Sequence, residues 1–239
     1  MKYKLTKETK EHLGRTLHRI VCVTAFADVS AGELGGWIES ENNLDQSGNS
    51  WVYDNAQVYG NAHVYGNAEV SGDAWVAGNA RVSGNAHVYG NAEVYGAAHV
   101  YGDAEVYGNS WVYDNARVYG DALVSGNAHV YGNAEVSGDA EVSGDAEVYG
   151  NSWVHDNAWV YGNARVEKTA DYIVLKNNWS SGRYFTYTRS NKMWKVGCFY
   201  GTGEELIKKA YADSELSGKC YEAAVRYAES LEKIQAEVK

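Results

Sequence analysis

Valine recurs at every sixth position from Val52 to Val166, twenty times without an exception. Two residues before each valine stands a small residue, which is alanine in seventeen units and serine at Ser50, Ser110 and Ser152. Residues two apart in an extended strand point to the same side, so this pair is predicted to face inward. In most units a glycine and then Asn or Asp follow, and these residues tolerate positive φ at low cost. Each unit is therefore predicted to be one short strand and one corner.

Three such units make a triangular coil of eighteen residues, and a fixed short repeat of this kind dictates a solenoid. Coils stacked at about 4.8 Å would give a rod of roughly 32 Å with nearly seven coils. Valine and alanine fill its narrow interior, so any ligand must bind outside. We predict an all-β solenoid, a parallel β-helix at residues 49–166, between an N-terminal β cap at 1–48 and a small α+β domain at 167–239.

The ends of a solenoid expose unpaired strand edges that must be covered. Before the repeat we expect a strand at 2–5, a turn near Gly14 and an apolar strand around 19–24. Trp37, Ile38 and Leu44 resemble an irregular first coil, two residues out of step with Val52.

After the repeat ends at Glu167, alternating residues predict strands at 171–176, 183–188 and 193–200. The segment from Thr202 to Glu205 fits a helix capping box. A final helix is expected to bury one apolar face. The residues of that face are Cys220, Ala223, Ala224, Tyr227, Leu231 and Ile234.

The segment before the repeat contains the runs Lys4-Leu5-Thr6, Gly14-Arg15-Thr16-Leu17 and Leu34-Gly35-Gly36-Trp37-Ile38-Glu39. Together with the repeat, it resembles a family of bacterial and phage hexapeptide-repeat proteins whose members are often labelled acyltransferases. The run Gly197-Cys198-Phe199-Tyr200-Gly201-Thr202 resembles a domain attached to such proteins in prophages. The resemblance implies a left-handed β-helix, an exception to the right-handed rule for parallel crossovers.

The net charge of −10 is concentrated in the repeat, where residues 49–166 carry −11. An acidic rod argues against general nucleic-acid binding, which needs a Lys/Arg surface. No stretch is long and apolar enough for a membrane span or an export signal, so we expect a cytoplasmic protein of a bacterial host. The three cysteines, Cys22, Cys198 and Cys220, lack metal spacing and are expected to be free thiols.

The resemblance also implies an enzyme: in hexapeptide acyltransferases a histidine acts as base, acyl-CoA lies between subunits of a trimer, and a loop usually breaks out of a coil. The repeat here is unbroken, and four of its five histidines occupy the variable position before valine. We therefore assign no catalytic residue. The five are His63, His87, His99, His129 and His155. A zinc site is not expected, because His63 and His99 are two coils, about 9.6 Å, apart.

The residues that precede valine sort onto three faces of the coil. On the first face they are Trp51, Glu69, His87, Glu105, Leu123, Glu141 and Trp159. On the second face they are Gln57, Trp75, Glu93, Trp111, His129, Glu147 and Arg165. On the third face they are His63, Arg81, His99, Arg117, Glu135 and Trp153.

The third face has four consecutive coils without an acid, and it is our candidate ligand site. Its first four residues are expected to stack at about 4.8 Å and to need a neutralising partner. The column after valine adds Tyr65, Tyr101 and Tyr119, which suit a small anionic, nucleotide-like ligand. The alternative is that Asp103 or Asp121, at the following corner, pairs with an arginine.

The second face carries contiguous aromatic surface, which predicts self-association into a homo-oligomer. Its members are Tyr59, Trp75, Tyr95, Trp111, Tyr113, Tyr131 and Tyr149. The alternative is that the tyrosines only pack on one another across neighbouring strands.

These observations favour a non-catalytic binding module of the phage or prophage type, which binds a small anionic ligand or a host protein, for instance against a host defence. An acyl-CoA-dependent acyltransferase is the alternative, and a purely structural rod is the second alternative. No metal or cofactor is expected, except acetyl-CoA if the chain is an acyltransferase.

Overall fold

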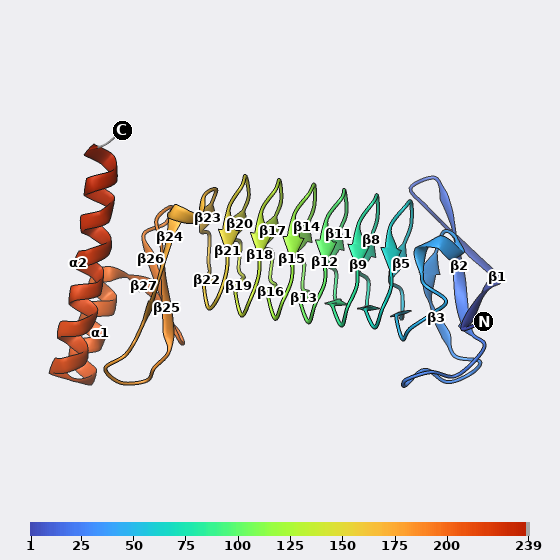
Figure 1. Cartoon of the computed structure of the whole chain (residues 1–239), viewed down its shortest axis with the longest axis horizontal. Helices are drawn as coiled ribbons and strands as arrows, with labels where there is room; N and C mark the ends of the chain where they lie inside the picture. Colours follow the sequence, from blue (N-terminus) through green and yellow to red (C-terminus); the bar gives the residue numbers. More distant parts are fainter. Residues whose placement is uncertain (238–239) are drawn as a thin grey trace.

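The computed structural model describes residues 1–237, and they form a β-solenoid with a different structure at each end (Figure 1). Three parallel sheets run along the rod, one per face, because residues eighteen apart pair with each other. The predicted eighteen-residue coil and the parallel β-solenoid are thus confirmed.

Every solenoid strand is two residues long. The first-face sheet contains β4 (Trp51–Val52), β7 (Glu69–Val70), β10 (His87–Val88), β13 (Glu105–Val106), β16 (Leu123–Val124), β19 (Glu141–Val142) and β22 (Trp159–Val160). The second-face sheet contains β5 (Gln57–Val58), β8 (Trp75–Val76), β11 (Glu93–Val94), β14 (Trp111–Val112), β17 (His129–Val130), β20 (Glu147–Val148) and β23 (Arg165–Val166). The third-face sheet contains β6 (His63–Val64), β9 (Arg81–Val82), β12 (His99–Val100), β15 (Arg117–Val118), β18 (Glu135–Val136) and β21 (Trp153–Val154).

The interior is a column of valine and alanine. Every repeat valine from Val52 to Val166 has 0% exposure, and the alanines two residues before them are equally buried. The serines that replace alanine keep their hydroxyls satisfied: Ser110 and Ser152 each donate to a backbone carbonyl at 2.8 Å. The predicted inward assignment of valine is confirmed.

At the N-terminal end, a hairpin of β1 (Tyr3–His12) and β2 (Arg15–Cys22) joins β3 (Leu34–Ile38), which extends the second-face sheet. The expected turn near Gly14 is present, with positive φ at Leu13 and Gly14. A short 3₁₀ helix, η1 (Glu41–Asn43), follows. Ile38 pairs with Val58 at a spacing of twenty residues, which confirms an irregular first coil two residues out of step.

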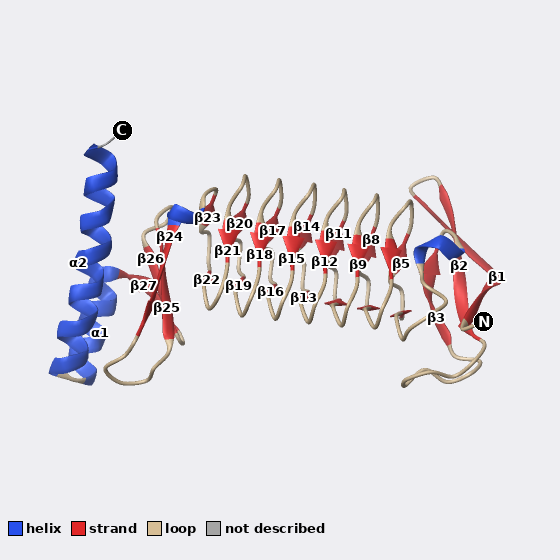
Figure 2. Ribbon diagram, viewed as in Figure 1, coloured by secondary structure: helices blue, strands red, loops and turns tan. Residues whose placement is uncertain are grey.

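At the C-terminal end, η2 (Thr169–Asp171) leads into an antiparallel sheet of β24 (Tyr172–Lys176), β25 (Tyr184–Thr188), β26 (Met193–Val196) and β27 (Phe199–Thr202). Two helices, α1 (Gly203–Asp213) and α2 (Glu215–Glu237), cover the side of this sheet away from the rod (Figure 2). The expected single strand at 193–200 is wrong, because Gly197 adopts positive φ and turns the chain into a hairpin.

The capping box at the start of α1 is confirmed: the Thr202 hydroxyl accepts from the Glu205 amide at 3.3 Å. The buried face predicted for the final helix is wrong. Tyr221, Val225 and Ala228 are buried, whereas Tyr227 and Ile234 are about half exposed. The chain also breaks into two helices at Ser214, and packing of α2 against the sheet and α1 sets its rotation.

The two edges of the solenoid are closed by opposite hydrogen-bonding groups. Within the rod, the amide before each valine donates to the carbonyl of the small residue one coil later, as His63 does to Ala80 at 3.0 Å. The first coil therefore presents carbonyls at its open edge. They accept from the Lys2 ammonium at Ser50, from the Trp37 amide at Ala56 and from the Asn43 side chain at Ala62, all at 2.8–2.9 Å.

The last coil presents amides instead, and one hydroxyl accepts from each face. The Trp153 amide donates to Thr169 at 3.1 Å, Trp159 to Thr186 at 2.8 Å and Arg165 to Ser190 at 2.6 Å. Since an unpaired backbone amide in a partly buried place is costly, these three side chains terminate the sheet chemically as well as sterically.

Candidate functional site

The third-face column forms as predicted, with His63, Arg81, His99 and Arg117 on successive paired strands. Burial lowers the pKa of His99, and the two arginines beside it lower that pKa further. Arg117 pairs with Glu135 on the next coil at 3.4 Å. Among residues 1–237, Arg81 forms no ion pair, so it is the cation of this column that a ligand could neutralise.

The tyrosines beside this column are already engaged with their neighbours. The rings of Tyr101 and Tyr119 stack at 4.9 Å, and the Tyr119 hydroxyl donates to Glu135 at 3.1 Å. Tyr65 lies tilted against His63 at 5.0 Å. The alternative, in which Asp103 or Asp121 pairs with an arginine of this column, is wrong. Arg117 pairs with Glu135, and Asp103 accepts a hydrogen bond from Asn85.

The second-face tyrosines form a continuous stack within the chain. Tyr95, Tyr113, Tyr131 and Tyr149 follow one another at 5.0, 5.0 and 5.2 Å. Tyr59 is buried against the N-terminal cap, where it contacts His12 at 5.2 Å. Of the residues proposed for self-association, Trp111 is the most open, with 37% exposure.

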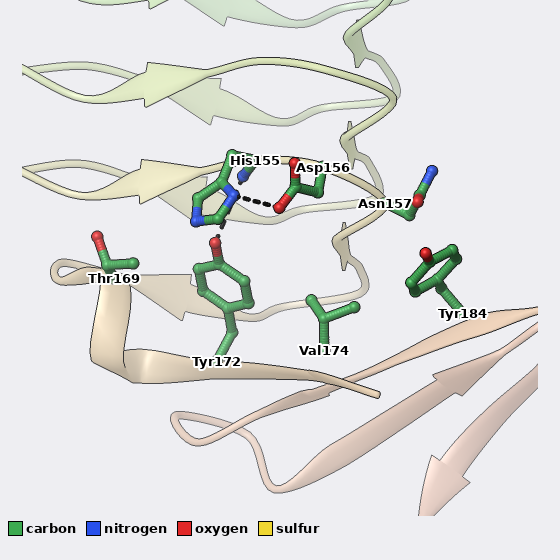
Figure 3. Close-up of a pocket in the computed structure, with 7 residues that line it drawn as sticks. All are labelled: His155, Asp156, Asn157, Thr169, Tyr172, Val174 and Tyr184. Carbon is green, nitrogen blue, oxygen red and sulfur yellow. Dashed lines mark hydrogen bonds and ion pairs between the residues drawn. The ribbon is translucent and has the colours of Figure 1, made fainter. Parts of the chain in front are cut away.

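A cavity of about 630 Å³ opens where the last coil meets the C-terminal sheet. It is lined by His155, Asp156, Asn157, Thr169, Tyr172, Val174 and Tyr184 (Figure 3). Junctions between structural units are common places for ligand sites. Its walls come from two sources: the repeat supplies His155 and its two neighbours, and the tail supplies the others.

His155 differs from the other four solenoid histidines in its position and its partner. It follows Val154 instead of preceding it, and its Nδ1 lies 2.8 Å from a carboxylate oxygen of Asp156. Asp156 takes the corner position that glycine holds in most units and has φ of 57° there. An imidazole that donates from Nδ1 to this carboxylate has Nε2 as its proton acceptor.

Tyr172 stands beside this pair and fixes the wall of the cavity. Its hydroxyl donates to the Trp153 carbonyl at 2.9 Å. The same hydroxyl accepts from the His155 amide at 3.4 Å (Figure 3). Thr169 is held in the same way by the Trp153 amide. The closure of the solenoid edge and the shape of the cavity therefore depend on the same side chains.

The sequence alone assigned no role to His155, because its importance depends on the folded tail. One signal was present: the run Trp153-Val154-His155-Asp156-Asn157 repeats Trp51-Val52-Tyr53-Asp54-Asn55 with histidine in place of tyrosine. Within residues 1–237, no three His, Cys, Asp or Glu side chains come together as a metal site.

Comparison with known proteins concerns the repeat. A family model described as the YdcK beta solenoid repeat matches residues 56–72, 111–126 and 116–132. The chain is a hexapeptide-repeat β-solenoid. A relative in Escherichia coli (strain K12), the "Uncharacterized acetyltransferase YdcK", is 40% identical over 63 residues. That segment is 22% of this chain and only 19% of the relative.

The predicted resemblance to hexapeptide-repeat proteins is thus confirmed. The three family-model matches lie within the solenoid and do not reach the C-terminal domain, whose likeness to a prophage domain remains a prediction. None of the described helices is long and apolar enough to cross a membrane.

Proposed function

We propose that the chain transfers an acyl group from a thioester donor to a hydroxyl or amine acceptor in the junction cavity. The observation that carries this proposal is the His155 imidazole, held by Asp156 and open to a cavity of about 630 Å³. A base oriented by a second group inside a concave site is the usual arrangement for proton transfer.

The reaction assigns a role to each atom of the pair. Nε2 of His155 accepts the proton of the acceptor as its oxygen or nitrogen attacks the thioester carbonyl carbon. The bond from carbon to sulfur then breaks, and the thiolate leaves with the proton from the imidazolium. The Asp156 carboxylate, 2.8 Å from Nδ1, stabilises the positive ring.

Two further observations support acyl transfer. The Lys176 ammonium lies 5.1 Å from the ring of Tyr184, which places a positive charge beside the cavity for an anionic donor such as acetyl-CoA. The partial relative from Escherichia coli is named an acetyltransferase, although this chain spans about a fifth of its length.

The test is acetyl-CoA turnover with a panel of hydroxyl and amine acceptors. With the acceptor that reacts, we expect His155→Ala to lower the rate by about 10²- to 10⁴-fold. Asp156→Asn should also lower the rate. His87→Ala is the matched control, a solenoid histidine on the first face and outside the cavity, and should leave the rate unchanged. Turnover that survives in His155→Ala, or no turnover with any acceptor, contradicts the proposal.

A second candidate is the non-catalytic binding module that the sequence favours. What supports it is the cationic column of the third face, in which Arg81 forms no ion pair among the described residues. Calorimetry with mono-, di- and cyclic nucleotides tests this function. Binding should disappear in an Arg81→Glu/Arg117→Glu variant, and no binding by the wild type excludes the nucleotide site.

A further inference from the structure

The tyrosine column of the second face is interrupted at one position. After the valine of each unit stands Tyr or Ser in nearly every case, and Ala77 is the only alanine there. On the second face it separates Tyr59 from the stack that begins at Tyr95. Because each step of the stack is close to 5.0 Å, one missing ring leaves two steps between Tyr59 and Tyr95.

A cavity of about 340 Å³ occupies this interruption. Tyr59 and Tyr95 stand on either side, Ala77 lies between them, and Trp75 and Glu93 form one wall. His12, from the N-terminal hairpin, contacts Trp75 at 4.7 Å and Tyr59 at 5.2 Å, so the cap holds two of the aromatic walls. An apolar space of this size between rings suits one flat aromatic group.

A second regularity of the solenoid concerns the hydroxyls of these columns. A tyrosine donates to the glutamate sixteen residues later at three places: Tyr89 to Glu105 at 2.8 Å, Tyr119 to Glu135 at 3.1 Å and Tyr131 to Glu147 at 3.1 Å. Each pair spans two adjacent columns of one face. The hydroxyl therefore satisfies a carboxylate that neighbouring side chains partly desolvate.

Glu93 lacks this donor, because the residue sixteen positions earlier is Ala77. Its strand lies between those of Trp75 and Trp111, and burial raises the pKa of its carboxyl group. Within residues 1–237 its side chain forms no hydrogen bond or ion pair. Ring and hydroxyl are thus missing together at one place.

We propose that this gap binds a small phenol, whose ring stacks between Tyr59 and Tyr95 and whose hydroxyl donates to Glu93. The ligand takes the place of the tyrosine side chain that position 77 lacks. A charge-assisted hydrogen bond to a partly desolvated carboxylate discriminates against rings without a donor. The gap lies on the second coil, near the N-terminal cap, whereas the junction cavity lies at the last coil. This site therefore does not depend on acyl transfer in the junction cavity.

The probe is 4-methylphenol, which has the chemical structure of a tyrosine side chain, and toluene is the ring without a donor. Titrations followed by NMR should shift the Ala77 methyl and Trp75 indole signals, with a dissociation constant on the order of 1 mM for so small a ligand. Toluene should bind about tenfold more weakly or worse. Equal binding of both probes, or no shift with either, overturns the proposal.

Two variants locate the site. Ala77→Tyr fills the gap and should abolish binding while the fold remains as stable as the wild type, because it restores the ring and the hydroxyl. Ser83→Tyr adds the same side chain on the third face, between Tyr65 and Tyr101, and should leave binding unchanged. Binding that persists in Ala77→Tyr overturns the proposal. So does a wild-type dimer that Ala77→Tyr converts to a monomer, since a second copy would then occupy the gap.

Discussion

Replacing Thr186 by valine tests whether side-chain hydroxyls close the C-terminal edge of the solenoid. Thr186 is 1% exposed, and its hydroxyl accepts the Trp159 amide at 2.8 Å. Valine keeps the shape and removes the acceptor. A partly buried amide left without a partner costs about 1–3 kcal/mol, so Thr186→Val should lower the free energy of unfolding by that amount.

Thr186→Ser is the matched control, because it keeps the hydroxyl and removes only a methyl group, at a cost of about 1 kcal/mol. Urea unfolding measures both variants. Native-state hydrogen exchange adds a local measurement: the Trp159 amide should exchange faster in Thr186→Val and normally in Thr186→Ser. If the Trp159 amide remains protected in Thr186→Val and the stability is unchanged, the hydroxyl does not close the edge.

Three other predictions concern the core, the N-terminal edge and the second face. Val100→Asp places an unpaired charge at a position with 0% exposure, so the rod should lose its fold or its solubility, and wild-type melting would contradict the inward assignment. Burial lowers the pKa of Lys2 to about 8, below its value in the unfolded chain. Between pH 8 and 10 the unfolded state therefore binds more protons than the folded state. The stability of the wild type relative to Lys2→Met should therefore rise with pH across that range, as urea unfolding at several pH values would show, and a flat difference would contradict it. Light scattering at micromolar concentration should detect an oligomer formed through the face around Trp111, and a strict monomer would refute self-association.

The rod could be predicted from sequence because a six-residue period leaves one arrangement that buries every valine. The same period sorted the outward residues onto faces, and strand pairing reproduces the third-face column from His63 to Arg117. The partner of Arg117 was missed. Glu135 lies in the same column one coil later, and the Arg117 side chain is long enough to reach it. The ion pair therefore forms along the column and not with an aspartate at the corner.

The C-terminal end resisted prediction for a different reason. Thr169, Thr186 and Ser190 lie in irregular or strand segments without a period, and only the folded tail brings them to the edge. The prediction of the buried face of α2 failed for a similar reason. Two faces of the helix carry apolar side chains, and packing against the sheet selects the face with Tyr221 and Val225. His155 could be singled out only after the tail closed a cavity around it.

Because one edge presents backbone carbonyls and the other presents backbone amides, the rod can change in length without a change at either end. Every coil presents carbonyls toward the cap and amides toward the tail, so each terminal structure meets the same groups whatever the number of coils between them. Duplication or deletion of eighteen residues would change the separation of the two ends by about 4.8 Å per coil and leave both junctions intact. Length in such a protein is free to change by whole coils, whereas an insertion of one residue within a strand would reverse which side chains face inward.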